Sequence, residues 1–281
     1  MTDTKSKLVP LSELTMLDRF LFDEVMENEQ IHQLILEIIL GKDIALLTRA
    51  ETEKELRTSP LLRSIRMDVF SMDEDRFIYN TEAQKQRKLD LPKRSRYYQG
   101  LLDSSLLEPG SVHFNLLNDS FLIVITPYDV FGLGKYRYTF RARCDENPSC
   151  ILSDGAVRIF LNTKGTNREK AGEELAQFLE YAEKTDDRTA LNSDSEKIQR
   201  IHEYIRMLKS SEEMGVKYMQ AWEERLQILE EGRSEGLEEG LKKGIGLTKE
   251  VLRLSAQGRS ESEISELCAV SPDQVRRILD T

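Results

Sequence analysis

Cysteine is scarce in this chain, and long apolar runs are missing. The 281 residues include three cysteines, Cys144, Cys150 and Cys268, and neither their spacing nor their odd number fits a zinc site or a disulfide framework. No run of about 18 apolar residues appears, so the sequence predicts no membrane-spanning helix. Residues 1–10 are polar and lack the apolar core of a signal peptide. These absences predict a protein of the reducing cytoplasm without a membrane partner.

An overall excess of basic residues is missing as well. The formal net charge is −10 and the isoelectric point is near 5.1, which argues against a protein that coats nucleic acid non-specifically. The charge is uneven, because residues 85–98 hold six basic side chains and one acid. Such a segment could neutralise phosphates, the main source of non-specific nucleic-acid affinity. A solvated loop explains the same charges equally well.

The apolar pattern predicts a mixed α/β sheet flanked by helices. A hydrophobic content of 39% suffices for one such core plus an appendage. The continuous apolar run of residues 121–125 predicts a central strand that is buried on both faces. Helical spacing predicts helices over residues 11–40, 91–107 and 169–184, and short strands are expected at residues 44–47, 136–143 and 157–161.

Residues 65–84 predict a β-hairpin, around which the rest of the chain is organised. Two apolar runs flank the polar residues 71–76, which are turn formers. This arrangement is typical of two antiparallel strands joined by a turn. The turn is expected to centre on Glu74 or Asp75.

That turn places Asp68 opposite either Asn80 or Glu82. Opposed residues in an antiparallel pair share a face and successive side chains alternate, so Asp68 joins Asn80, Glu82 and Gln84 on one face. Neighbouring carboxylates repel unless a proton or a cation intervenes. A divalent ion such as Mg²⁺ fits, because it takes oxygen ligands. The alternative is a hairpin with one ordinary solvated face.

Further candidate residues lie on the two flanking helices. Asp18 and Glu24 belong to the region of residues 11–40, and either could approach the hairpin carboxylates, with Glu24 favoured. Acids on an amphipathic helix are, however, usually its wet face. The helix of residues 91–107 has a proline in its first turn, and its spacing leaves Arg94 and Gln99 accessible.

The composition changes near residue 186, and we expect three segments: a core over residues 1–185, a helical acidic linker with repeated glycine over 186–246, and a small helical tail over 247–281. In the linker, glycines recur every four residues from Gly232 to Gly244. This row either permits close approach of a second helix or marks a flexible tether. The tail spacing suits a helix-turn-helix, yet its charge does not favour DNA, so a packing module is an equal alternative.

Several stretches together resemble one protein family. They are residues 17–22, 66–69, 79–84, 94–99, 136–140 and 160–162, together with the acidic glycine row and the helical tail. The chain thereby resembles the recombination-promoting nuclease and transposase-like family, which is part of the PD-(D/E)XK nuclease superfamily. The resemblance covers nearly the whole chain. It implies a restriction-endonuclease-like fold with an α-helical C-terminal extension.

The resemblance also implies Mg²⁺-dependent hydrolysis of DNA phosphodiesters, with Mn²⁺ as a substitute, during recombination or transposition. Asp68 matches the aspartate of the motif and Glu82 its second acid, and both would hold the metal with the backbone carbonyl of Ala83. Gln84 stands where the superfamily usually has lysine. A lysine would orient water and offset phosphate charge, whereas glutamine can hydrogen-bond water but carries no charge. Asp18, Glu24 and Gln99 remain accessory candidates, and Lys93, Arg94 and Arg96 would bind DNA phosphates.

Three hypotheses therefore follow from the sequence. The first is a metal-dependent DNA endonuclease, which the presence of both Asp68 and Glu82 favours. The second is a catalytically weak or inactive relative that binds DNA or protein. The third is a regulatory or homo-oligomerising protein, in which the helices of residues 186–281 carry the main function.

Overall fold

The computed structural model describes residues 8–56, 65–106 and 113–280, and gives the backbone alone for residues 48–56 and 65–68. The chain divides into two compact units, Met1–Tyr218 and Met219–Thr281. None of the described helices has both the length and the apolar character needed to cross a membrane.

The first unit is built on a six-stranded mixed sheet, which confirms the predicted α/β class. The strands are β1 (Leu47–Leu56), β2 (Ile65–Asp73), β3 (Ile78–Ala83), β4 (Ser120–Thr126), β5 (Arg137–Phe140) and β6 (Ala156–Asn162). They lie in the order β1-β2-β3-β4-β6-β5. Strands β1, β2 and β3 are successively antiparallel, β4 is parallel to both β3 and β6, and β5 is antiparallel to β6.

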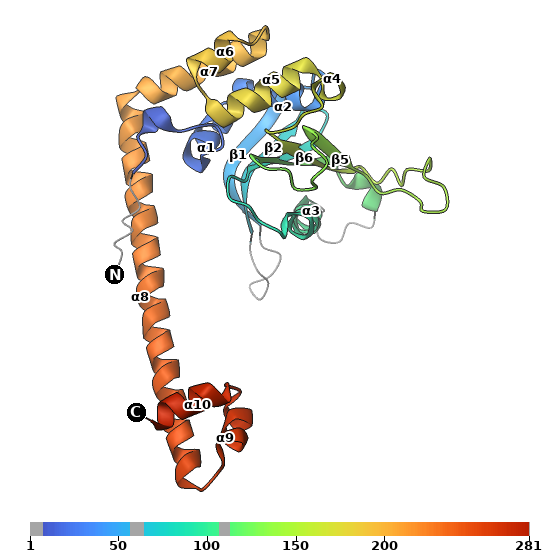
Figure 1. Cartoon of the computed structure of the whole chain (residues 1–281). Coiled ribbons are helices and arrows are strands. Elements are labelled where there is room, and N and C mark those ends of the chain that lie inside the picture. Colours follow the sequence, from blue (N-terminus) through green and yellow to red (C-terminus); the bar gives the residue numbers. More distant parts are fainter. Residues whose placement is uncertain (1–7, 57–64, 107–112, 281) are drawn as a thin grey trace. The chain divides into compact units, whose positions relative to one another are not determined.

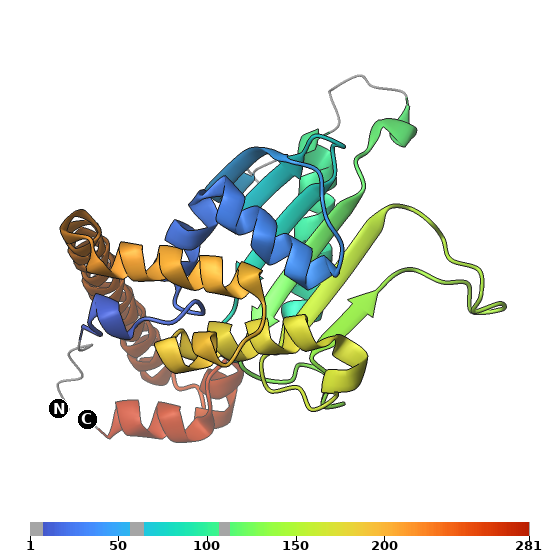
Figure 2. The same cartoon turned by 90° about the horizontal axis from the view of Figure 1, so that it is seen from above.

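Helices cover both faces of this sheet (Figures 1 and 2). The main core lies on the face covered by α1 (Arg19–Glu27), α2 (Glu29–Leu40), α5 (Glu173–Lys184) and α7 (Glu196–Ser210). Helix α3 (Leu91–Leu106) covers the other face. The short helices are η1 (Leu11–Glu13), η2 (Phe114–Leu116), α4 (Arg168–Ala171) and α6 (Asp187–Leu191).

The predicted hairpin is confirmed as β2 and β3, and a buried carboxylate closes it. Asp73 is 2% exposed. It accepts a hydrogen bond from the Phe77 backbone N–H at 2.8 Å and from the Tyr79 hydroxyl at 2.7 Å. Burial together with this carboxylate raises the pKa of Tyr79, so the phenol remains a donor. The turn is thereby fixed, and with it the pairing of the two strands.

Other boundaries differ from the sequence expectation. The first strand covers residues 47–56 rather than 44–47, because a charged, polar segment forms the edge of the sheet. An edge strand pairs with a neighbouring strand on one side only, so it accepts charged residues that a central strand would exclude. The helix expected over residues 169–184 is interrupted at Gly172, whose φ of 92° is incompatible with a continuous helix. Tyr136 precedes β5 and packs into the main core, whereas Tyr138 belongs to the cluster beneath α3.

Helices α6 and α7 belong to the main core, although the sequence placed them in the linker segment. Ala190, Ile198, Ile201 and Ile205 are at most 1% exposed and lie in the core cluster. The first unit accordingly extends to Tyr218. The polar stretch after residue 185 is a short helical connection rather than a boundary between units.

The second unit contains most of the long helix α8 (Glu212–Ala256), followed by α9 (Glu261–Cys268) and α10 (Pro272–Leu279). A small core joins the end of α8 to the two short helices through Val251, Leu254, Ile264 and Val275. Both short helices begin with a capping box, at Ser260 and at Ser271. The glycine row is helical, and, apart from the adjoining backbone of the same helix, a Cβ added at any of its four glycines would meet no described atom within 4 Å.

We expect His32 to make the stability of the first unit depend on pH. Its imidazole on α2 is fully buried, and burial lowers its pKa from 6.5 to about 3. Below pH 6.5 the unfolded chain therefore binds a proton at this imidazole, whereas the folded chain does not. The free energy of unfolding is highest above pH 6.5, where the imidazole is neutral in both states. It decreases as the pH falls toward 3, by about 2 kcal/mol between pH 7 and pH 5.

Chemical denaturation of wild type and His32→Gln at both pH values measures this effect. The loss of unfolding free energy on acidification should be smaller in the variant by about that amount. His113→Gln is the matched control, because His113 is exposed. An equal pH dependence in all three proteins would contradict the assignment.

Candidate functional site

The candidate site lies at the C-terminal end of β3, on the face of the sheet that α3 covers. Strand alternation sends Tyr79 into the main core and Ile78 beneath α3. Asn80 and Glu82 follow the parity of Ile78, as the sequence predicted. Asn80 is 1% and Glu82 is 9% exposed, so this face is not a solvated one. A buried carboxylate requires a compensating partner.

The strand register places Asp68 beside Glu82. Val69 pairs with Thr81 and Phe70 pairs with Asn80. The next position outward on each strand is therefore Asp68 on β2 and Glu82 on β3, which selects one of the two predicted registers. The side chain of Asp68 lies outside the described part of the structure, so the register concerns its backbone alone.

Arg94 is the described cation that faces Glu82. Its Nη2 donates to Glu82 Oε1 in an ion pair and to Gln84 Oε1 at 2.8 Å. Gln84 in turn donates from Nε2 to the carbonyl of Gln86 at 2.8 Å. The guanidinium also lies 5.6 Å from the centre of the Tyr98 ring. One nitrogen atom therefore gathers the oxygens of Glu82 and Gln84 at a single point.

Helix α3 delivers Arg94 to this point through its first turn. Leu91 is 1% exposed and packs with Leu122 and Val124 of β4, which fixes the start of the helix on the sheet. The Arg94 N–H then makes the first helical hydrogen bond, to the Asp90 carbonyl at 2.8 Å. Arg94 was expected to contact DNA from an accessible position. Its side chain is instead 21% exposed and turned toward the sheet.

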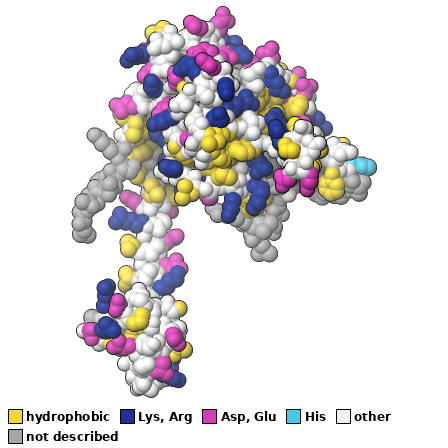
Figure 3. Space-filling view, turned by 45° about the vertical axis from the view of Figure 1, so that its right-hand side comes forward, with side chains coloured by type: hydrophobic (Ala, Val, Ile, Leu, Met, Phe, Trp, Pro, Cys, Tyr) yellow, Lys and Arg dark blue, Asp and Glu magenta, His cyan; other side chains and the backbone are white. Residues whose placement is uncertain are grey.

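The other proposed phosphate ligands are exposed. Lys93 and Arg96 lie on the solvent side of the same helix, and no described acid lies within ion-pair range of either. On the face drawn in Figure 3, basic side chains are interspersed with acidic and apolar ones. Lys93 and Arg96 are therefore accessible for an external anion, whereas Arg94 is engaged internally.

The accessory acids Asp18, which precedes α1, and Glu24, within α1, have their own basic partners. Glu24 is 8% exposed and pairs with Lys217 Nζ at 2.7 Å. Asp18 pairs with Lys85 Nζ at 2.6 Å. Burial would raise the pKa of Asp18, but the hydrogen bonds from Lys85 and Thr15 outweigh it and lower that pKa. Lys85 thereby ties the segment after β3 to the start of α1.

Gln99 is buried rather than accessible, contrary to the sequence expectation. It is 9% exposed and donates to Ser120 Oγ at 2.8 Å and to Asp103 Oδ1 at 2.9 Å. Ser120 begins β4, so this group lies at the opposite end of the strands from Gln84. The structure does not bring Gln99 to Glu82.

Tyr128 was missed in the sequence although it borders the site. Its hydroxyl donates to the Gln86 carbonyl at 2.9 Å and accepts from the Lys88 N–H. Burial raises the pKa of Tyr128, so it remains an O–H donor. It lies in a loop after β4, far along the chain from β3, and no local pattern signals the contact.

The donor set suits a hard divalent ion. Glu82 supplies a carboxylate oxygen and Ala83, the last residue of β3, a backbone carbonyl, while the Gln84 amide lies beside the carboxylate. The oxygens of Glu82 and Gln84 already converge on one cation, and oxygen ligands are those that Mg²⁺ takes. Among the described side chains, which exclude that of Asp68, no group of three His, Cys, Asp or Glu residues is placed to hold a metal. Within this described part of the structure, Glu82 therefore faces a guanidinium rather than further acids.

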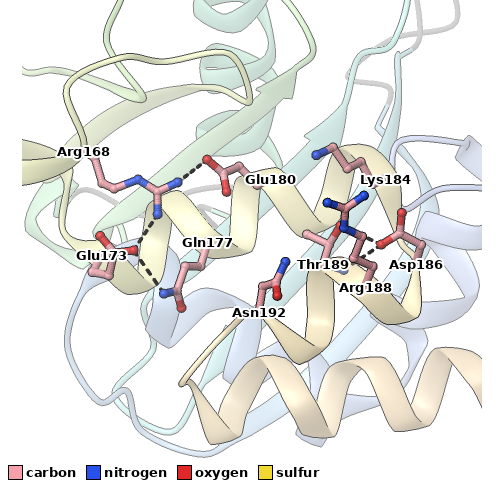
Figure 4. Close-up of a pocket in the computed structure, with 9 residues that line it drawn as sticks. All are labelled: Arg168, Glu173, Gln177, Glu180, Lys184, Asp186, Arg188, Thr189 and Asn192. Atoms are coloured by element: carbon pink, nitrogen blue, oxygen red, sulfur yellow. Dashed lines mark hydrogen bonds and ion pairs between the residues drawn. The ribbon is translucent and has the colours of Figure 1, made fainter.

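A separate polar cavity of about 550 Å³ lies among α4, α5 and α6 (Figure 4). It is lined by Arg168, Glu173, Gln177, Glu180, Lys184, Asp186, Arg188, Thr189 and Asn192. Arg168 pairs with both Glu173 and Glu180, and Asp186 accepts from Thr189. Helix α5 covers the face of the sheet opposite to α3, so this cavity is distinct from the site at Glu82.

We expect removal of Arg94 to destabilise the first unit more than removal of its exposed neighbour. Arg94→Met leaves the Glu82 carboxylate without its guanidinium and should lower the unfolding free energy by roughly 2–4 kcal/mol. Arg96→Met, the matched control, should change it by less than about 0.5 kcal/mol. Urea unfolding measures both. Equal effects would show that the buried pair does not stabilise the fold.

No protein-family model matches the chain, and no curated protein or solved structure matches it either. The functional assignment therefore depends on the residues at the end of β3 and their surroundings. Those residues are a carboxylate, an amide and a guanidinium gathered at one point, with the backbone of Asp68 alongside.

Proposed function

We propose that this chain is a metal-dependent deoxyribonuclease that acts in DNA recombination or transposition, with a restriction-endonuclease-like core. The convergence of the Glu82 and Gln84 oxygens on one cation, beside Asp68 in the strand register, carries this proposal. A mixed sheet with helices on both faces is compatible with such a core. The three free cysteines fit the reducing cytoplasm as its compartment.

In this proposal, Asp68, Glu82 and the Ala83 carbonyl would hold Mg²⁺, or Mn²⁺ in its place. When bound, the metal would polarise the scissile phosphate and lower the pKa of an attacking water. The Gln84 amide would hydrogen-bond that water. Lys93 and Arg96 contact DNA phosphates from the exposed side of α3, where their charges strengthen binding without reading sequence.

We expect purified full-length protein to nick or cleave plasmid DNA in the presence of Mg²⁺ or Mn²⁺. Chelation should abolish this activity. Asp68→Ala and Glu82→Gln should each lower the rate by at least roughly 100-fold, the scale of losing one electrostatic contact to the transition state. A gel assay of supercoiled plasmid measures the loss.

Asp75→Asn is the matched control for these variants. Asp75 lies in the turn of the same hairpin and is exposed, so its activity should equal that of wild type. Intact plasmid with folded wild-type protein, across metals and pH values, would contradict the nuclease proposal. Equal activity of Asp68→Ala and wild type would show that Asp68 is not a catalytic residue.

The second candidate function is a non-catalytic module that binds DNA or protein. The ion pair between Arg94 and Glu82 favours it, because the carboxylate already has a positive partner without a metal. Gln84 in place of a lysine also favours it. A protein that binds DNA equally well with chelator or Mg²⁺, and never cuts it, would match this candidate.

We further propose that α8 pairs with a second copy of itself in an antiparallel arrangement. Several of its apolar side chains are at least half exposed, namely Val216, Ile228, Leu229, Leu237, Leu241, Ile245 and Leu252. Residues 223–239 hold seven acids and two basic residues, whereas residues 242–253 hold four basic residues and one acid. Antiparallel copies that meet near Gly240 bring the acidic stretch of each opposite the basic stretch of the other.

Light scattering after size exclusion tests this pairing. We expect a dimer that Leu237→Ser with Leu241→Ser converts to monomer, and that high salt weakens because screening removes the charge complementarity. Leu89→Ser is the control, because Leu89 is 91% exposed and lies in the first unit. A monomeric wild type at all salt concentrations would contradict the proposal.

A further inference from the structure

Arg94 occupies the position that a metal ion at Glu82 would need. Its Nη2 is bonded to Glu82 Oε1 and to Gln84 Oε1, which are two of the oxygens assigned to the proposed catalytic centre. A divalent cation on Glu82 would lie within a few ångströms of the guanidinium. Like charges at that separation repel strongly in a partly buried site. Arg94 and the metal therefore compete for the same carboxylate.

Arg94 already borders solvent while it is paired with Glu82. It lies in the first turn of α3, its side chain is already 21% exposed, and the face of Tyr98 supports its guanidinium. Lys93 and Arg96 are exposed on the same turns. A phosphate that approaches the first turn of α3 from solvent would meet in the released guanidinium a planar fork that suits it.

We propose that Arg94 is a phosphate clamp that metal binding releases. It holds Glu82 and Gln84 together in the metal-free protein, and it turns to a DNA phosphate when a divalent cation takes its place on Glu82. This inference depends on the proposed nuclease function. It also predicts the order of binding: the metal binds first, and the Arg94 guanidinium then becomes free to contact a DNA phosphate. It also supplies beside Gln84 the positive charge that glutamine lacks.

Binding measurements with Ca²⁺, in place of the ions used for cleavage, test the clamp apart from catalysis. Wild type should bind a short labelled duplex about tenfold more tightly with Ca²⁺ than with chelator, which corresponds to one charge-assisted contact. Arg94→Gln should lose this gain and should bind Ca²⁺ severalfold more tightly in calorimetry, because the competing cation is gone. Arg96→Gln should weaken DNA binding by the same factor with and without Ca²⁺.

A second measurement requires no variant, in case Arg94→Gln does not fold. The Nε–Hε NMR signal of Arg94 in the wild-type chain should shift and lose protection from solvent exchange as Ca²⁺ is added. An unchanged signal at saturating Ca²⁺ would overturn the clamp. Arg94→Gln with the Ca²⁺ affinity and the Ca²⁺-dependent DNA gain of wild type would overturn it as well.

The outcomes separate the clamp from the nuclease proposal. A wild type that binds no divalent ion and cuts no DNA refutes the nuclease function, and the clamp with it. A wild type that binds Ca²⁺ at Glu82 and cuts DNA with Mg²⁺, while Arg94 stays paired throughout, refutes the clamp alone. In that case the pair between Arg94 and Glu82 is structural.

Discussion

The site depends on one constraint, which is that β3 is buried on both of its faces. The first five residues of this strand are all buried. Side chains alternate, so each polar residue must lie either in the main core or beneath α3. Glu82 falls beneath α3, where an unpaired carboxylate would be strongly unfavourable. Its pairing with Arg94 satisfies the charge and also fixes the first turn of α3 to the sheet.

The same ion pair links stability and proposed chemistry. A carboxylate with a guanidinium partner is a stable arrangement without a ligand, whereas a carboxylate that holds a metal needs the guanidinium elsewhere. In the proposed function, the site would exchange one cation, the guanidinium, for another, the metal. The accessory acids Asp18 and Glu24 are likewise paired, with Lys85 and Lys217. Each acid that the sequence proposed as a ligand, and whose side chain is described, therefore has a basic partner.

Much of the fold could be predicted from the sequence because its signals are local. Apolar spacing located α3 and β4, the turn formers located the hairpin, and the spacing of the tail predicted its short helices. The first strand was misplaced because an edge strand can be charged and polar, which removes the apolar signal. The sequence predicted that the core ends at residue 185, which is too early, because the polar residues that follow resemble a linker. Helix α7 nevertheless carries a buried apolar stripe.

The sequence by itself determined which residues share a face of β3, since alternation is a property of the strand. It also located the carboxylate and amides at the end of that strand. The tertiary structure alone decided what those groups contact. Arg94 looked like an accessible base on a helix, yet the packing of Leu91 against β4 turns it toward Glu82. Gln99 was assigned near the same site, yet the direction of α3 carries it to Ser120 at the other end. Contacts between a sheet and a helix depend on how the two elements pack, and no spacing within either one encodes that.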